Sequence, residues 1–293
     1  MDFAILGCAA FAIFRIGWAV SERNRFSKFN GFGCIDDVMS KRADAPMAYR
    51  VLMPLLVAKI PQRFKLISYA LLQVVGIFLL LLTCKTLVSM QFALILGVLV
   101  TATMRFDYWD WIPEMGAFVS CALGNLPLAI AWTAASSLSR ETSVILPLVW
   151  VLSGHDIKFA GLILVEVAAL MSLVRLWQGK KKLYCDRIMI SKNGQEVHQW
   201  MLSSLHPKPN GDIWSPAAIL QHGHGAVLIS DMLVSIVLTG GALLSAIHFG
   251  IPNGLTPLIV VSMGWTFAIA RENRVMGTSL IWICLWMCNY SFA

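Results

Sequence analysis

The sequence predicts an all-α integral membrane protein, a single domain over residues 1–293 with about eight to ten transmembrane or re-entrant helices. Hydrophobic residues make up 58% of the chain and charged residues 13%, about half the charged share of a soluble domain. The apolar runs, such as residues 74–82, 92–100 and 227–247, are continuous rather than alternating, which favours helices over a closed barrel. Small clusters of acids and arginines interrupt these runs. Ionisable groups near hydrocarbon cost on the order of 3 kcal/mol each, so such clusters indicate a polar site within a membrane protein.

The first half of the chain divides into apolar segments separated by charge. A helix crossing the roughly 30 Å hydrocarbon layer needs about 20 residues, and proline should kink a helix that contains it. In chain order we expect helices at 3–20, 47–60 (kinked at Pro54), 66–83 and 87–104, with a polar loop at 21–46 and a basic turn at 61–65.

The second half begins with an aromatic and acidic stretch at 105–114, in which Pro113 is well placed for the first turn of a new helix. Residues 115–153 are apolar, but breaks at 124–127 and 139–142 leave pieces that are short for full spans. Residues 157–177 are long enough to cross a membrane. A long polar loop at 179–225 follows, and three spans at 226–248, 253–270 and 275–291 close the chain.

The net charge of +7 is typical of basic loops beside anionic lipid headgroups and does not require a nucleic acid partner. Five basic residues in loop 21–46 and three lysines at 180–182 each favour a cytoplasmic position for their own loop. The sequence does not settle the orientation. The seven cysteines are scattered without metal-ligand spacing, which indicates neither a disulfide framework nor a zinc site.

Two acidic clusters are candidates for chemistry. Asp36 and Asp37 follow the first expected helix, where a carboxylate can deprotonate a hydroxyl or hold a metal ion; a solvated turn is the alternative. Asp107, Asp110 and Glu114 have the spacing of one helical stripe. They are equally consistent with a site and with an interfacial segment, which the neighbouring tryptophans fit.

Two clusters that contain arginine are also candidates for a functional site. Arg140 and Glu141 are adjacent and cannot share a helix face, so each needs its own partner; a capped turn between short helices is the alternative. Arg271 and Arg274 are three residues apart, so a helical turn would direct both guanidinium groups to one side, as a phosphate requires. A positive connector at the membrane face is the alternative for this pair.

Three of these segments together resemble a known family. Residues 48–56 (AYRVLMPLL) look like the opening of the second helix in bacterial membrane glycosyltransferases of the GT-C superfamily. Residues 139–143 (SRETS) look like an N-R-E-T turn of the same proteins, and residues 271–274 (RENR) lie where many of them carry an E-x-R element.

The resemblance implies transfer of a sugar from a polyprenyl-phosphate carrier to a glycan, lipid or protein hydroxyl outside the cytoplasm, with a general-base aspartate in the first external loop. That sidedness is opposite to the one that charge favours for loop 21–46. Asp36 or Asp37 would be the catalytic base, and loop 179–225 would cover the site. The expected substrate-binding residues are Arg50, Asp110, Glu114, Arg140, Glu141, Arg271, Glu272 and Arg274, of which Arg271, Arg274 and Arg140 would neutralise the lipid phosphate. Arg50 and Glu141 would orient the loop and the headgroup, and Asp110 or Glu114 would bind the acceptor or a divalent cation.

The expected location is the plasma (inner) membrane, in several passes, with envelope-biosynthesis proteins as candidate partners. No metal site is expected from the ligand spacing, and a divalent cation held by carboxylates is the one candidate cofactor. Two other functions fit the same features. A transporter or flippase of a lipid-linked or anionic solute would also use broken helices and paired charges. A non-catalytic scaffold of an envelope-polysaccharide complex would need the same membrane helices.

Overall fold

The computed structural model describes residues 2–21, 38–41, 47–103, 108–181, 188–190 and 196–198, and residue 244. These residues are helical except for turns and one short hairpin. The helices are α1 (Asp2–Ser21), η2 (Met47–Tyr49), α3 (Leu52–Val57), α4 (Gln62–Leu87), α5 (Met90–Thr103), α6 (Tyr108–Ala122), α7 (Leu126–Ser137), η3 (Glu141–Ile145), α8 (Leu146–Leu152) and α9 (Ile157–Gln178). The predicted helical fold is thus confirmed for this part of the chain, whereas its polytopic membrane character stays a prediction.

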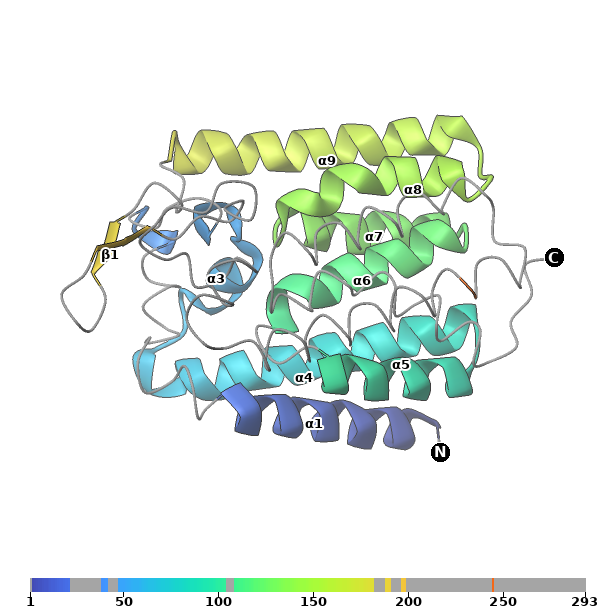
Figure 1. Cartoon of the computed structure of the whole chain (residues 1–293), viewed down its shortest axis with the longest axis horizontal. Coiled ribbons are helices and arrows are strands. Elements are labelled where there is room, and N and C mark those ends of the chain that lie inside the picture. Colours follow the sequence, from blue (N-terminus) through green and yellow to red (C-terminus); the bar gives the residue numbers. More distant parts are fainter. Residues whose placement is uncertain are drawn as a thin grey trace.

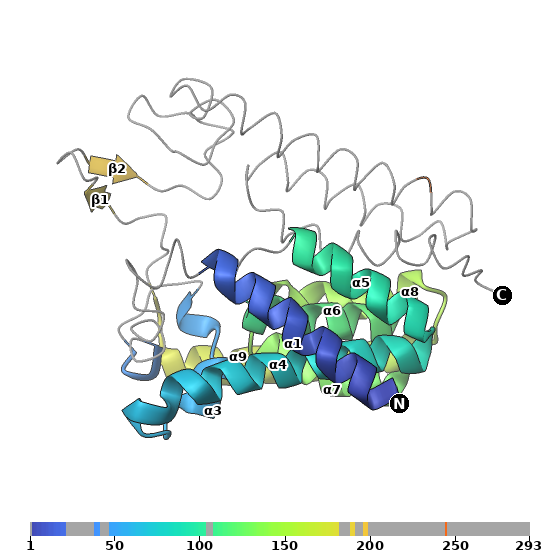
Figure 2. The ribbon, with the colours of Figure 1, turned by 90° about the horizontal axis from the view of Figure 1, so that it is seen from below.

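The helices form a bundle in which α9 lies along one edge and α1 along the opposite edge (Figure 1). Between them, α8 and α7 are followed by α6 and then by α4 and α5. Seen from below, α1 passes in front of α4 (Figure 2). The largest fully buried side chains, among them Phe92 on α5, Phe118 on α6 and Ile163 on α9, belong to one continuous apolar core.

Close contact between α6 and α7 depends on a glycine. A Cβ atom at Gly116 would lie 2.3 Å from the ring of Trp132 on α7, so only glycine leaves room for this indole. Trp132 Nε1 in turn donates a hydrogen bond of 2.9 Å to Thr83 Oγ1 on α4. The indole therefore joins three helices, and α6 and α7 act as one rigid pair.

Two predicted boundaries differ from the structure. Pro113 lies inside α6, which begins five residues earlier at Tyr108, because a proline near a helix start removes only one backbone hydrogen bond. The predicted basic turn at 61–65 is mostly helical: only Pro61 precedes α4, and Arg63 and Lys65 belong to its first turn. Lysine and arginine have high helix propensity, and proline stands just before the first helical residue.

The remaining elements agree more closely with the sequence. The predicted helices at 3–20 and 157–177 correspond to α1 and α9, whereas 47–60 contains only the short η2 and α3. Within the expected loop 179–225, β1 (Ile188–Ile190) pairs antiparallel with β2 (Glu196–His198). The predicted closing spans lie outside the described residues, apart from residue 244.

Two helical stretches of the described chain are long and apolar enough to cross a membrane, Ile67–Leu87 and Ile157–Gln178. A core helix of a soluble protein can be equally apolar, but it would be buried. On α4, the side chains of Ile67, Leu71, Val75 and Leu79 follow one another at intervals of four residues and are each 44–60% exposed. This spacing makes one continuous apolar stripe on the outside of the bundle.

The turns at one end of the bundle are closed by local hydrogen bonds; we call this the capped end, comprising Asn125, Trp150, His155 and Asp156. Asn125 Oδ1 accepts from the amide of Leu128, and Asp156 Oδ1 accepts from the amide of Lys158. His155 Nε2 lies 3.1 Å from the carbonyl oxygen of Ala122, and Trp150 Nε1 donates to the carbonyl oxygen of Asp156. These contacts satisfy helix ends that would otherwise leave backbone groups unpaired.

Candidate functional site

At the other end of the bundle, polar and charged side chains from four separate parts of the chain come together. We call this the charged end, comprising Tyr49, Arg50, Glu114, Arg140, Glu141 and Arg175. Arg140 occupies it because the chain turns sharply between α7 and η3, with Arg140 in an extended conformation (φ −150°, ψ 145°). The turn thereby directs a buried arginine into the space beside α6.

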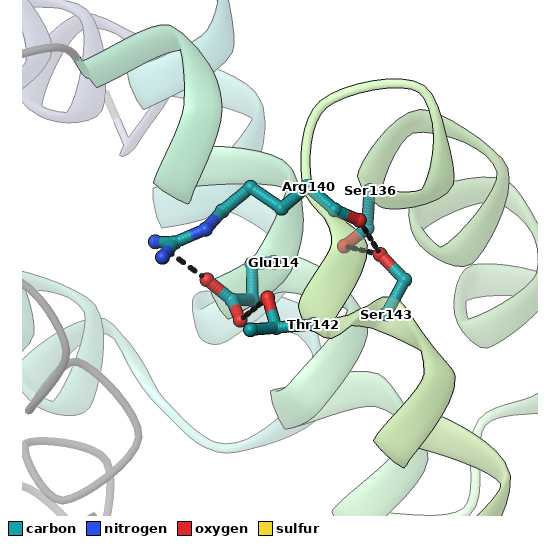
Figure 3. Close-up of polar contacts among 5 residues, drawn as sticks. All are labelled: Glu114, Ser136, Arg140, Thr142 and Ser143. Atoms are coloured by element: carbon teal, nitrogen blue, oxygen red, sulfur yellow. Dashed lines mark hydrogen bonds and ion pairs between the residues drawn. The ribbon is translucent and has the colours of Figure 1, made fainter. Parts of the chain in front are cut away.

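Arg140 forms an ion pair with Glu114 of α6, with 2.9 Å between Nη1 and Oε2 (Figure 3). Only 9% of the arginine side chain and 16% of the glutamate side chain is exposed. The other carboxylate oxygen, Oε1, accepts a hydrogen bond from Thr142 Oγ1. Such a pair holds two costly charges in one geometry, and removal of either partner would leave the other uncompensated.

Hydroxyl groups fix the backbone that carries Arg140. Ser143 Oγ donates to the carbonyl oxygen of Arg140 at 2.9 Å and lies 2.7 Å from Ser136 Oγ (Figure 3). Ser139 Oγ bonds the carbonyl oxygen of Ala135 at 2.8 Å. The serine-rich sequence around 136–143 therefore stabilises the turn, which leaves the Arg140 side chain for the contact with α6.

Segment 48–56, one of the three that resemble glycosyltransferase motifs, is hydrogen-bonded to the residue that precedes segment 139–143. The amides of Val51 and Leu52 both donate to the carbonyl oxygen of Leu138, at 2.7 and 2.9 Å. Arg50 precedes this contact and is 6% exposed. Segment 48–56 and segment 139–143, about 90 residues apart in sequence, thus meet at the charged end.

A small recess opens at this meeting point. Among the described residues its lining is Tyr49, Ser137, Arg140, Glu141, Met171, Val174 and Arg175, and it has room for about one water-sized group. The guanidinium carbon of Arg175 lies 5.8 Å from the centre of the Tyr49 ring, within cation–π range. A mobile cation at the rim thus accompanies the buried Arg140.

The turn at 38–41 is attached to the same end. Val38 is buried against Val51 and Val174, and its carbonyl oxygen accepts a 3.0 Å hydrogen bond from Gln178 Nε2 at the end of α9. Lys181 Nζ donates to the carbonyl oxygen of Lys41. Asp36 and Asp37 immediately precede this anchored turn in the sequence, but both lie outside the described residues.

The structure brings four predicted site residues together: Arg50, Glu114, Arg140 and Glu141. Asp110 lies on α6 one helical turn before Glu114. Arg271, Glu272 and Arg274 lie outside the described residues, as do Asp107 and the two aspartates of the first loop. Within the described ranges, no group of three or more His, Cys, Asp or Glu side chains could hold a metal ion.

Three residues of the recess were not among the predicted site residues: Tyr49, Ser137 and Arg175. Tyr49 belongs to the quoted 48–56 segment, which was a usable signal. Ser137 resembles any small residue near a helix end, and Arg175 resembles a basic residue at the end of a membrane span. Only the packing of α9 against α7 and η2 places these two side chains beside Arg140.

Comparison of the chain with models of protein families, with curated proteins and with solved structures finds no match in any of the three. The function is therefore argued from the residues themselves and from their arrangement.

Proposed function

We propose that this chain is a multi-pass protein of the plasma (inner) membrane that transfers a sugar from a polyprenyl-phosphate carrier to a hydroxyl acceptor. One observation carries the proposal: a cluster of buried, partnered arginines lies at the end of a helical bundle with an apolar exterior. Eighteen residues of α9 separate Ile157 from Arg175, about 27 Å of helix. In a bilayer about 30 Å thick, the charged end would then lie close to one hydrocarbon boundary, where a lipid-linked phosphate resides.

The outer surface of the bundle supports a membrane location. The exposed stripe of α4 is matched on α9 by Val165, Leu173 and Leu176, which are 61–81% exposed. Soluble monomers rarely expose large contiguous apolar patches. Lipid chains would cover both surfaces without any cost for exposing apolar groups to water.

The charge at the charged end favours an anionic headgroup. Among its described residues, the arginines at 50, 140 and 175 exceed the glutamates at 114 and 141 by one positive charge. Arginine binds phosphate through paired N–H donors. A phosphate ester that enters here would therefore meet an excess of guanidinium groups in a region of low water content, where such contacts are strongest.

The proposed reaction assigns roles to residues on both sides of this cluster. Asp36 or Asp37 takes the proton of the acceptor hydroxyl, whose oxygen forms the new bond to the anomeric carbon. The bond between that carbon and the phosphate oxygen breaks, and the phosphate leaves with its electron pair. Arg271 and Arg274, with Arg140, stabilise the charge that develops on it. The anchoring of Val38 supports this assignment because Asp37 is bonded directly to a residue held at the charged end.

Release of polyprenyl phosphate by the purified chain tests transfer directly. Donors carrying different radiolabelled hexoses are supplied in turn, with and without a crude acceptor fraction. We expect acceptor-dependent release, lost by at least 100-fold in Asp36→Asn or Asp37→Asn. Arg63→Gln is the matched control, because Arg63 lies in the first turn of α4, contacts Phe64 and does not line the recess.

Either of two outcomes would contradict the proposal and identify a different function. Uptake of intact lipid-linked sugar into vesicles without release of the phosphate would identify a transporter. Unchanged cellular function of both aspartate variants and of Arg140→Gln, with loss only when a partner protein no longer binds, would identify a scaffold.

A further inference from the structure

Two residues that line the recess at the charged end each have a buried oxygen atom without a hydrogen-bond partner among the described residues: Ser137 Oγ and Glu141 Oε1. Ser137 is 4% exposed, so bulk water does not satisfy its hydroxyl. A buried polar group left unpaired costs about 1–3 kcal/mol. Two such atoms lining one recess indicate that a small polar group completes them.

The chemistry of the two atoms restricts that group. A carboxylate oxygen only accepts hydrogen bonds, whereas a serine hydroxyl both donates and accepts. An alcohol can donate to Glu141 and accept from Ser137 at once. An unprotonated phosphate oxygen offers no proton to Glu141, and any phosphate brings further negative charge beside it. The pair therefore favours a hydroxyl over a phosphate.

The size of the recess points in the same direction. The recess has room for about one water-sized group, enough for one hydroxyl and too little for a whole sugar ring. The ring would remain outside, beside Tyr49 and Arg175 at the rim. We propose that the recess between Ser137 and Glu141 binds one hydroxyl group of a sugar substrate, while the arginines beside it face the phosphate. The identification of the ligand as a sugar rests on the proposed function, whereas the preference of the recess for a hydroxyl group does not.

Fluorine NMR on the full chain in detergent tests this proposal without any transfer reaction. The chain has five tyrosines, so 3-fluorotyrosine labelling gives a small spectrum, and Tyr49→Phe identifies the signal from the recess. The probes are the methyl glycosides of glucose, galactose, mannose and N-acetylglucosamine, with inorganic phosphate at equal ionic strength. We expect a saturable shift of the Tyr49 signal with at least one glycoside that depends on Ser137, whereas any shift with phosphate, which binds the neighbouring Arg175, does not depend on Ser137.

Variants of the recess complete the test. Ser137→Ala and Glu141→Gln should each weaken glycoside binding by about tenfold, which corresponds to the loss of one buried hydrogen bond. Glu166→Gln is the matched control, because Glu166 on α9 also has a buried oxygen without a described partner but does not line the recess. The other four tyrosine signals report whether each variant is folded. If Glu141→Gln does not fold, Ser137→Ala alone decides the result.

Each alternative result has a separate meaning. A Tyr49 shift that phosphate causes and that Ser137→Ala abolishes would overturn the preference for a hydroxyl and make the recess an anion site. No shift with any glycoside, or equal binding in both recess variants, would show that water fills the recess. Glycoside binding without any transfer activity would leave the hydroxyl subsite standing and remove the transferase proposal.

Discussion

The two ends of this bundle satisfy their polar groups in different ways. At the capped end, neutral groups and one exposed carboxylate bond to backbone atoms, mostly within a few residues of themselves. At the charged end, Arg140 pairs with a glutamate 26 positions earlier in the chain, and the recess retains oxygen atoms without described partners. Capping accounts for the first end completely. The second end carries more charge than a helix turn needs, which is typical of a binding site.

The largest expected effect comes from removal of one member of the buried ion pair. Arg140→Gln should lower the free energy of unfolding by about 3 kcal/mol, because Glu114 would remain buried without its partner. The double variant Arg140→Gln/Glu114→Gln should recover more than 1 kcal/mol of that loss. Denaturant unfolding in detergent measures both. Additive effects of the two substitutions would contradict a functional coupling between α6 and the Arg140 turn.

At the capped end, the expected loss of folding stability comes from backbone geometry. Gly124 has a φ of +71°, and a Cβ atom there would lie 2.5 Å from the His155 ring. Gly124→Ala should therefore cost about 2 kcal/mol through strain and displacement of the imidazole. Binding of a lipid phosphate should not change. A loss of binding in this variant would show that the two ends are coupled and would break the contrast between them.

A weaker effect, on binding rather than stability, is expected at the rim of the recess. Arg175 is exposed and contacts the Tyr49 ring. Arg175→Gln should weaken binding of decaprenyl phosphate about tenfold, through the loss of a charge-assisted contact, and should leave unfolding unchanged. Lys158→Gln, at the opposite end of the same helix, is the control and should bind normally.

The smallest effect concerns a partly exposed ion pair between the first turn of α1 and the last turn of α4. Lys85 Nζ lies 2.7 Å from Asp2 Oδ2, and this hydrogen bond and charge hold the pKa of the Asp2 carboxyl below its usual value. A lowered carboxyl pKa contributes stability above the unfolded value of about 3.9 and loses it as the pH falls through the folded value. Unfolding of wild type and Asp2→Asn should therefore differ slightly at pH 7 and converge at low pH, once the Asp2 carboxyl is protonated in the folded chain. A difference that persists at low pH would assign the effect to something other than this ion pair.

Helices dominated by apolar pattern were predictable from the sequence. The run at 157–177 and its charged ends define α9 to within one residue, because length and composition alone set such a helix. The start of α6 was predicted wrongly from Pro113, since a proline signal is local and the helix gains its stability from packing against α4 and α7.

The candidate site was predictable in its residues but not in its pairing. Arg140 and Glu141 stood out as charges between apolar runs, and Glu114 stood out as part of an acidic stripe. The family resemblance made Glu114 a candidate to bind an acceptor or a divalent cation, and the structure pairs it with Arg140. A contact between residues 26 apart depends on how α6 and α7 fold back on one another, which a single sequence does not encode by spacing. The roles given to Asp36, Asp37, Arg271, Glu272 and Arg274 stay predictions.

The measurement that tests the central claim most directly is binding of decaprenyl phosphate, compared with decaprenol, to the full chain by native mass spectrometry. The charged end should make the wild-type chain prefer the phosphate lipid by at least tenfold. Arg175→Gln should lose that preference, and Arg63→Gln should keep it. Equal binding of the two lipids by the wild-type chain, or an unchanged preference in Arg175→Gln, would contradict the assignment of this end to a lipid-linked phosphate.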